Sequence, residues 1–171
     1  MRVAEVVGRV LYGHGARYVF GVVGSGNFHV TNALVAVGVR FVAAAHEGGA
    51  ASMADGYART SGTVGLLSVH QGPGVTNALT GVTEAAKSRT PMVVLAPEAT
   101  APRSNFFIDL PALAASVGAD FHRVRPTVRT VDDLEPVRRW LAGPRTRPLV
   151  VGAKVCSARG SWWLEEALRG H

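Results

Sequence analysis

The chain has 171 residues, of which 47% are hydrophobic and 18% are charged. This length and composition are typical of one soluble globular domain with its own core, and they exclude a disordered protein. The single cysteine, Cys156, excludes an intramolecular disulfide and suits a reducing cytoplasm. No apolar run reaches the roughly 18 residues of a membrane span, and the first twelve residues do not resemble a signal peptide. We therefore expect a cytoplasmic protein that does not bind membranes.

The net charge is +6 and the sequence pI is about 10.4, which suggests a nucleic-acid hypothesis. Residues 1–120 contain 8 basic and 7 acidic residues, whereas residues 121–171 contain 10 and 5. The excess lies in the last third, where the arginines lack the interleaved aromatic residues that stack on bases. The sequence therefore predicts a solvated basic face or a surface for an acidic partner, and no nucleic-acid site.

Helical and strand signals alternate along the chain, which is typical of a parallel sheet covered by helices. Amphipathic or small-residue segments predict helices at residues 3–11, 28–37, 48–60, 75–87, 110–117 and 130–142. Short apolar runs predict strands at residues 18–23, 41–45, 64–69, 92–96 and 148–151. The sequence thus predicts one α/β domain over residues 1–151.

Several local features refine these elements. Thr130 and Asp133 resemble a capping box at the start of the last predicted helix. Residues 97–105 are polar and marked by prolines, which predicts a loop, and Gly56 and Gly81 are expected to be packing glycines inside helices. Residues 152–171, with a candidate helix that carries two tryptophans, fit the alternation poorly and are treated as an atypical tail.

The predicted strand at residues 41–45 ends at His46 and Glu47, and a predicted helix follows at once. Ligands bind at the carboxyl ends of the strands in open parallel sheets, so Glu47 has a functional interpretation. It also has a structural one, because acidic residues in a first helical turn complement the positive end of the helix dipole. Its position alone leaves both interpretations open.

Several familiar motifs are absent from the sequence. His46-Glu47 begins like a zinc-protease helix, but Ala50 stands where the second histidine is required. The segment at residues 24–26 lacks the third glycine of a dinucleotide-binding fingerprint, and Ser25 lacks the Gly-x-Ser-x-Gly pattern of a hydrolase nucleophile. There is no P-loop, and the six histidines show no metal-ligand spacing. No metal site is predicted in this chain.

Three motifs that contain glycine accompany the first three predicted strands. They are residues 19–24 (VFGVVG), 46–59 (HEGGAASMADGYAR) and 72–77 (GPGVTN). In this order and spacing they resemble the N-terminal pyrimidine-binding (PYR) domain of thiamine-diphosphate-dependent enzymes, in the branch of acetolactate synthase and benzoylformate decarboxylase. The resemblance covers about residues 3–151. It implies a three-layer α/β/α fold with a mainly parallel central sheet.

The resemblance also implies roles for individual residues. Glu47 is matched with the glutamate that hydrogen-bonds the aminopyrimidine ring of thiamine diphosphate and activates it. His70 is matched with a substrate-facing histidine of the decarboxylase branch, and Ser25 with a substrate-side serine. The residues matched with the cofactor-binding segments are Gly24, Gly72, Pro73, Gly74 and Asn77. From residue types alone, a structural histidine, a turn serine and an ordinary turn at the start of a helix stay open for these positions.

Family members continue into a diphosphate-binding domain whose Gly-Asp-Gly motif and downstream asparagine hold Mg²⁺ and the diphosphate, and these 171 residues contain neither. Ile108 and Asp109 stand where synthases place a glutamine and an acidic residue. The resemblance thus implies one half of a 2-oxo-acid decarboxylase or synthase. A diphosphate- and Mg²⁺-binding domain on a separate chain, in a homo- or hetero-oligomer, would complete it, and the chain alone is not expected to be active. A truncated inactive domain and an interaction module that uses the basic tail stay open as alternatives.

Overall fold

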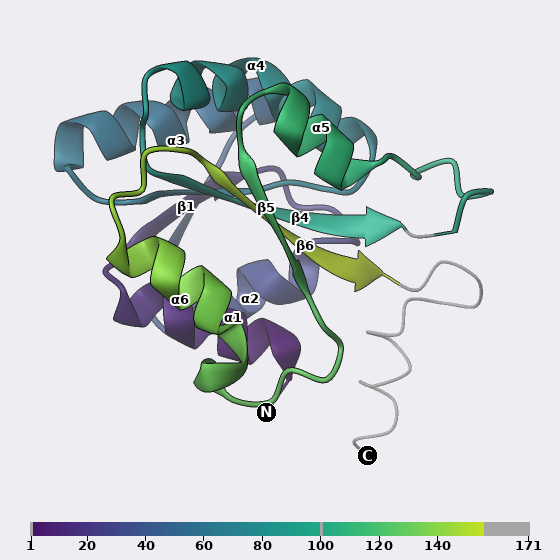
Figure 1. Cartoon of the computed structure of the whole chain (residues 1–171), viewed down its shortest axis with the longest axis horizontal. Coiled ribbons are helices and arrows are strands. Elements are labelled where there is room, and N and C mark those ends of the chain that lie inside the picture. Colours follow the sequence, from purple (N-terminus) through teal and green to yellow (C-terminus); the bar gives the residue numbers. More distant parts are fainter. Residues whose placement is uncertain (1, 100, 156–171) are drawn as a thin grey trace.

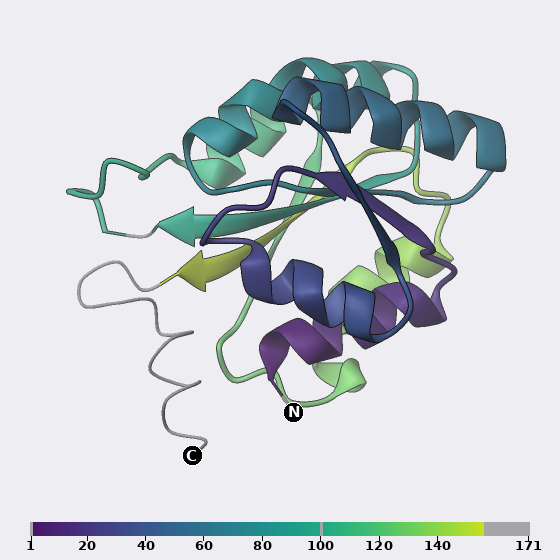
Figure 2. The ribbon, with the colours of Figure 1, turned by 180° about the vertical axis from the view of Figure 1, so that it is seen from behind.

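The computed structural model describes residues 2–99 and 101–155. Within this range, six parallel strands form one sheet between two layers of helices (Figures 1 and 2). The strand order is β2-β1-β3-β4-β6-β5. The predicted three-layer α/β/α fold with a parallel sheet is confirmed. The predicted tail helix with its two tryptophans falls in residues 156–171, outside the described residues.

The strands are β1 (Tyr18–Gly21), β2 (Arg40–Ala43), β3 (Gly65–Ser68), β4 (Met92–Ala99), β5 (Asp120–Val124) and β6 (Leu149–Val155). The helices are α1 (Val3–Gly13), α2 (Phe28–Ala36), α3 (Glu47–Ser61), α4 (Pro73–Lys87), α5 (Leu110–Ser116) and α6 (Glu135–Ala142), with a 3₁₀ turn, η1 (Val131–Leu134), before α6. Each element predicted between residues 3 and 151 is present. Strand β5 is an addition that the sequence did not predict.

Strand β4 is longer than predicted. Residues 97–99, expected to open a loop, continue β4 and pair with residues 153–155 of β6. Strand β3 pairs with β4 only as far as Leu95, so the rest of β4 has a partner on one side only. Such an edge tolerates Pro97, which has no N–H to donate. Because β4 offers this longer partner, β6 runs four residues beyond its predicted end at Val151.

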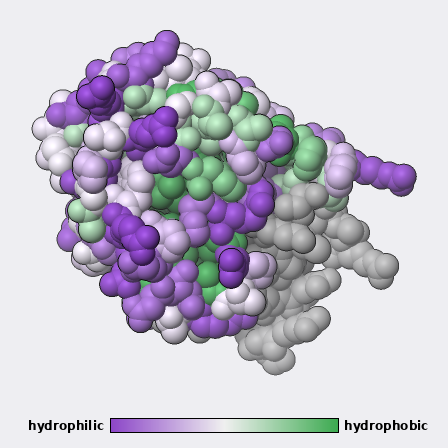
Figure 3. Space-filling view, viewed as in Figure 1, coloured by the Kyte–Doolittle hydropathy of each residue, from purple (hydrophilic) through white to green (hydrophobic). Residues whose placement is uncertain are grey.

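The two faces of the sheet carry separate apolar layers. Figures 1 and 2 show α1, α2 and α6 on one face and α3, α4 and α5 on the other. Side chains of a strand alternate between faces, so Val93 and Leu95 pack in the layer of α1 while Val94 packs in the layer of α3. In the space-filling view of Figure 3, hydrophobic residues come to the surface between α5 and α6, where β5 forms the edge of the sheet.

Helices α3 and α4 pack closely because small residues face each other. A Cβ atom added to Gly81 would lie 2.5 Å from the Cβ atom of Ala51, so Gly81 is a packing glycine, as predicted. A Cβ atom on Gly56 would contact nothing within 4 Å, so the same prediction for Gly56 is wrong. The predicted capping box of Thr130 and Asp133 is confirmed, and it opens η1 directly before α6.

The chain changes its direction of travel across the sheet next to β1. From β1 it moves to β2 at one edge, and it then returns to the other side of β1 to form β3. In open parallel sheets, ligands bind outside the carboxyl ends of the strands at such a switch point. The segments that follow β1 and β3, which contain Ser25 and His70, lie there.

Candidate functional site

A buried polar network joins the loop after β1 to the end of β3. Asn27 is completely buried, and its Oδ1 accepts a hydrogen bond of 2.8 Å from the Gly24 N–H. Its Nδ2 donates to Val22 O at 3.1 Å and to Ser68 Oγ at 3.0 Å. The Thr31 hydroxyl lies 3.0 Å from the same Ser68 oxygen. The sequence analysis did not single out Asn27, although asparagine is a frequent turn residue that bonds nearby backbone groups.

The fixed loop brings Ser25 against His70. The Oγ atom of Ser25 lies 3.2 Å from Nε2 of His70, and Nδ1 of His70 lies 3.0 Å from the carbonyl oxygen of Gln71. Because a carbonyl oxygen can only accept, Nδ1 carries the ring proton and Nε2 of the neutral ring accepts from the serine hydroxyl. Gly24 lies so close to the imidazole that a Cβ atom there would clash with the ring. The two predicted substrate-side residues therefore form a pair.

Glu47 is the first residue of α3, with three residues between it and the end of β2 at Ala43, and is half-buried. The cap of this helix is His46, whose Nδ1 accepts from the Gly48 N–H at 3.0 Å. The Glu47 side chain instead turns to α4, where its Oε2 accepts from Nδ2 of Asn77 at 3.0 Å. Among the described residues, Oε1 has no hydrogen-bond partner. The carboxylate therefore keeps one oxygen available for a ligand.

The segment after β3 supplies the backbone between two side-chain pairs. These are the Ser25–His70 pair and the Glu47–Asn77 pair. Gly72 has φ +65°, a conformation that favours glycine, and Pro73 is the first residue of α4, where its missing N–H costs nothing. A Cβ atom on Gly74 would lie 3.1 Å from the Cβ atom of His70 and 3.3 Å from Oε1 of Glu47. Gly74 thus lies between the two pairs and leaves the space beside the carboxylate open.

The loop between β4 and α5 adds a residue that the sequence analysis missed. The Phe106 ring contacts the His70 ring, with centroids 5.3 Å apart and planes inclined by 66°. The Phe106 backbone also lies against Gly72, where a Cβ atom would come within 3.1 Å of it. The predicted loop ended at residue 105, and no local pattern pairs Phe106 with a histidine 36 positions earlier.

The geometry thus groups all eight predicted residues at the carboxyl edge of the sheet. In the comparison with known proteins, residues 1–115 match the family described as "Thiamine pyrophosphate enzyme, N-terminal TPP binding domain". The chain belongs to this family. The resemblance inferred from the three motifs is therefore confirmed.

Relatives of this thiamine pyrophosphate enzyme domain include two kinds of enzyme. Over 99 residues the chain is 39% identical to a sulfoacetaldehyde acetyltransferase of Rhodobacter capsulatus, covering 58% of the chain and 17% of the relative. Over 93 residues it is 43% identical to an acetolactate synthase large subunit of Buchnera aphidicola, covering 54% and 16%. The chain thus spans about a sixth of the length of these curated relatives.

The residues at the edge of the sheet fit the aminopyrimidine part of thiamine pyrophosphate. An oriented carboxyl group with one unbonded oxygen suits a heterocycle that carries ring nitrogens and an amino group. The absence of a side chain at Gly74 keeps this oxygen accessible. Within residues 2–99 and 101–155, no cluster of three His, Cys, Asp or Glu side chains is placed to hold a metal ion. In the same ranges no helix is long and apolar enough to cross a membrane.

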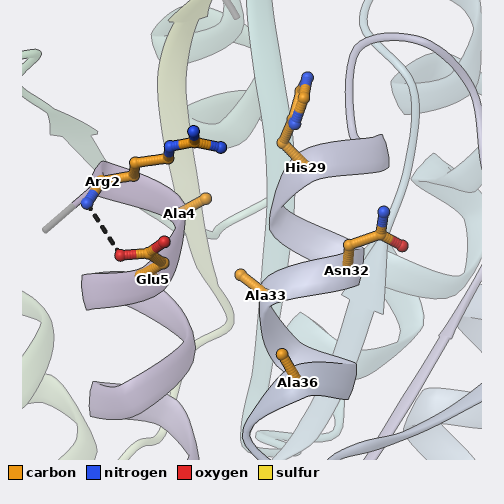
Figure 4. Close-up of a pocket in the computed structure, with 7 residues that line it drawn as sticks. All are labelled: Arg2, Ala4, Glu5, His29, Asn32, Ala33 and Ala36. Atoms are coloured by element: carbon orange, nitrogen blue, oxygen red, sulfur yellow. Dashed lines mark hydrogen bonds between the residues drawn. The ribbon is translucent and has the colours of Figure 1, made fainter. Parts of the chain in front are cut away.

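A separate hollow of about 270 Å³ lies between α1 and α2 (Figure 4). Its lining residues are Arg2, Ala4, Glu5, His29, Asn32, Ala33 and Ala36. Figure 4 shows the Arg2 side chain extending toward α2, at the end of the hollow where His29 lies. Burial lowers the pKa of His29, and the positive charge of Arg2 lowers it further. None of the predicted site residues lines this hollow, so it is distinct from the candidate site.

An open groove of about 790 Å³ runs between α3 and α4. Asp55 lies in it with only 8% of its surface exposed, and its Oδ2 pairs with Arg59 at 2.8 Å. Arg59 also reaches α4, where it donates to Glu84 at 3.0 Å and lowers the pKa of that carboxyl. Oδ1 of Asp55 is buried without a hydrogen-bond partner among the described residues.

Proposed function

We propose that the chain is the pyrimidine-binding half of a thiamine-diphosphate-dependent enzyme that acts on 2-oxo acids, and that Glu47 activates the cofactor. The carboxylate of Glu47 carries this proposal. It lies at the carboxyl end of β2, Asn77 holds its Oε2, and its Oε1 faces Gly74. Bound thiamine diphosphate supplies the electron sink for cleavage and formation of bonds next to a carbonyl group.

In this proposal Glu47 works by proton transfer. The donated hydrogen bond from Asn77 fixes the plane of the carboxyl group and leaves Oε1 to share a proton with a ring nitrogen of the cofactor. The open space beside Gly74 leaves this oxygen accessible to the ring.

We propose the decarboxylase interpretation ahead of the synthase one because of the Ser25–His70 pair. Neutral His70 accepts at Nε2 from the Ser25 hydroxyl, and protonated His70 donates from the same atom. A group that alternates in this way can bind the carboxylate of a 2-oxo acid and return a proton to the product. The hydrogen bond between Nδ1 and the Gln71 carbonyl oxygen contributes to directing Nε2 toward Ser25.

The proposal includes a partner. A second domain, on a separate chain, would hold the diphosphate and Mg²⁺, in a cytoplasmic homo- or hetero-oligomer. The chain matches about a sixth of the length of each relative, so most of each relative has no counterpart in these 171 residues.

The test combines the chain with the product of an adjacent gene that encodes Gly-Asp-Gly and a downstream asparagine. We expect the mixture, with Mg²⁺ and thiamine diphosphate, to turn over a 2-oxo acid, while each chain alone does not. Substituting Glu47→Gln should lower turnover by about 100-fold or more. Glu135→Gln, on α6 in the opposite helical layer, is the matched control. A wild-type mixture that neither binds the cofactor nor turns over substrate would support the inactive alternative instead.

A further inference from the structure

We infer that Phe106 is a positioning residue that fixes the orientation and tautomer of the His70 imidazole. The two rings meet edge to face, with centroids 5.3 Å apart and an interplanar angle of 66°. This is a favoured geometry for aromatic pairs. The catalytic meaning of the contact rests on the function proposed above, whereas the contact and its effect on the ring do not.

The remaining contacts of His70 leave a need for such a residue. Its Nδ1 is held by the carbonyl oxygen of Gln71 at 3.0 Å and its Nε2 by the Ser25 hydroxyl at 3.2 Å. Ser25 is exposed, and its hydroxyl rotates freely, so it bonds either tautomer. The torsion that turns an imidazole about its Cβ–Cγ bond has broad minima, so ring contacts add to the restraint from these two bonds. Gly24 lies against Cδ2 of the ring, and Phe106 meets the ring edge to face.

The position of Phe106 is itself held by the segment that follows His70. A Cβ atom on Gly72 would lie 3.1 Å from both Cα and O of Phe106, so only glycine lets the two loops approach this closely. On its own loop, the Phe106 N–H donates to Oγ of Ser104 at 3.2 Å. The neighbouring Phe107 is 43% exposed. Of these two adjacent phenylalanines, Phe106 is therefore the one built against the histidine.

The chemical consequence concerns the lone pair of Nε2. While Phe106 holds the ring, Nδ1 carries the proton and Nε2 presents its lone pair to Ser25. If the ring is free to turn, Nδ1 leaves the Gln71 carbonyl and the tautomer with the proton on Nε2 becomes populated. An aromatic pair of this geometry corresponds to a change of about 2- to 12-fold in the ratio of the two tautomers.

The test is ¹⁵N NMR of the imidazole rings in the chain itself, at a pH where the histidines are neutral. A His70→Asn variant identifies the signals of His70 among the six histidines. We expect the wild type to show the proton on Nδ1. Phe106→Leu should lower the ratio of the Nδ1–H to the Nε2–H tautomer by about 2- to 12-fold, and Phe106→Tyr, which keeps the ring, should restore it. Phe107→Leu is the matched control and should leave the ratio unchanged.

Phe106→Met provides a second variant, because its flexible side chain retains apolar volume while removing the ring. It should produce the same change in tautomer ratio, so the inference stays testable where Phe106→Leu does not fold. A wild-type ratio in Phe106→Leu together with a lowered melting temperature would show that Phe106 only packs, and would overturn the inference. An equal shift in Phe107→Leu would overturn it as well. Failure to find 2-oxo-acid turnover would contradict the proposed function but would not alter this ratio.

Discussion

Replacing Asn27 with alanine removes the side chain that ties the loop after β1 to the end of β3. Three hydrogen bonds of 2.8–3.1 Å are lost, from the Gly24 N–H, to the Val22 carbonyl and to the Ser68 hydroxyl. Each is worth about 1 kcal/mol net, and a buried group left without a partner costs about 1–3 kcal/mol. Ser68 keeps a bond to Thr31, and water can reach the half-buried Gly24 and Val22. We therefore expect a loss of about 3 kcal/mol, a large part of the ~5–15 kcal/mol stability of a typical domain.

Urea unfolding monitored by circular dichroism measures this loss as a change in the unfolding free energy. Asn32→Ala is the matched control, because Asn32 is an exposed asparagine on α2, the helix that begins directly after Asn27. Its stability should stay within about 0.5 kcal/mol of the wild type. An Asn27→Ala protein with wild-type stability and an unchanged urea dependence would refute the reasoning that this network fixes the Ser25 loop.

The close packing of α3 and α4 predicts that Gly81→Ala lowers the unfolding free energy by about 1–3 kcal/mol, because the new methyl group meets Ala51. Gly56→Ala, with open space around it, should raise the unfolding free energy by about 0.5–1 kcal/mol in the same urea assay. A stabilised Gly81→Ala protein would contradict this packing. Burial lowers the pKa of His29 and His122 below the ordinary value of 6.5, so below that pH the unfolded chain binds more protons than the folded one. The contribution of these two histidines to the unfolding free energy should therefore be fully present above about pH 7 and decrease toward pH 5. Replacing both with asparagine should flatten the dependence of the unfolding free energy on pH. An unchanged pH dependence in that double variant would show that these histidines do not cause it.

The parts of the fold that could be predicted are those encoded by short stretches of sequence. Apolar runs separated by helical segments predicted a parallel sheet, and His46-Glu47 could be placed at a strand end because both neighbours have clear periodicity. Once the sheet is parallel, its topology brings the segments after β1 and β3 together at the switch point. The proximity of Ser25 and His70 is a consequence of that topology.

The parts that could not be predicted depend on partners distant in sequence. Strand β5 is an edge strand of mixed polarity that pairs only with β6, so its own sequence carries a weak strand signal. Pro97 suggested a loop, because the one-sided pairing that permits a proline there arises only when β6 is in place. The contact of Phe106 with His70 likewise depends on Gly72 letting two loops meet. No local pattern encodes such contacts.

Hydrogen exchange at the reactive thiazolium carbon of bound thiamine diphosphate tests most directly whether Glu47 activates the cofactor. The measurement compares the exchange rate in deuterium oxide for the assembled wild-type protein and for Glu47→Gln, with cofactor and Mg²⁺ saturating in both. We expect the rate to fall by about 100-fold or more in Glu47→Gln, with the cofactor still bound. A wild-type exchange rate in that variant would show that Glu47 does not activate the cofactor.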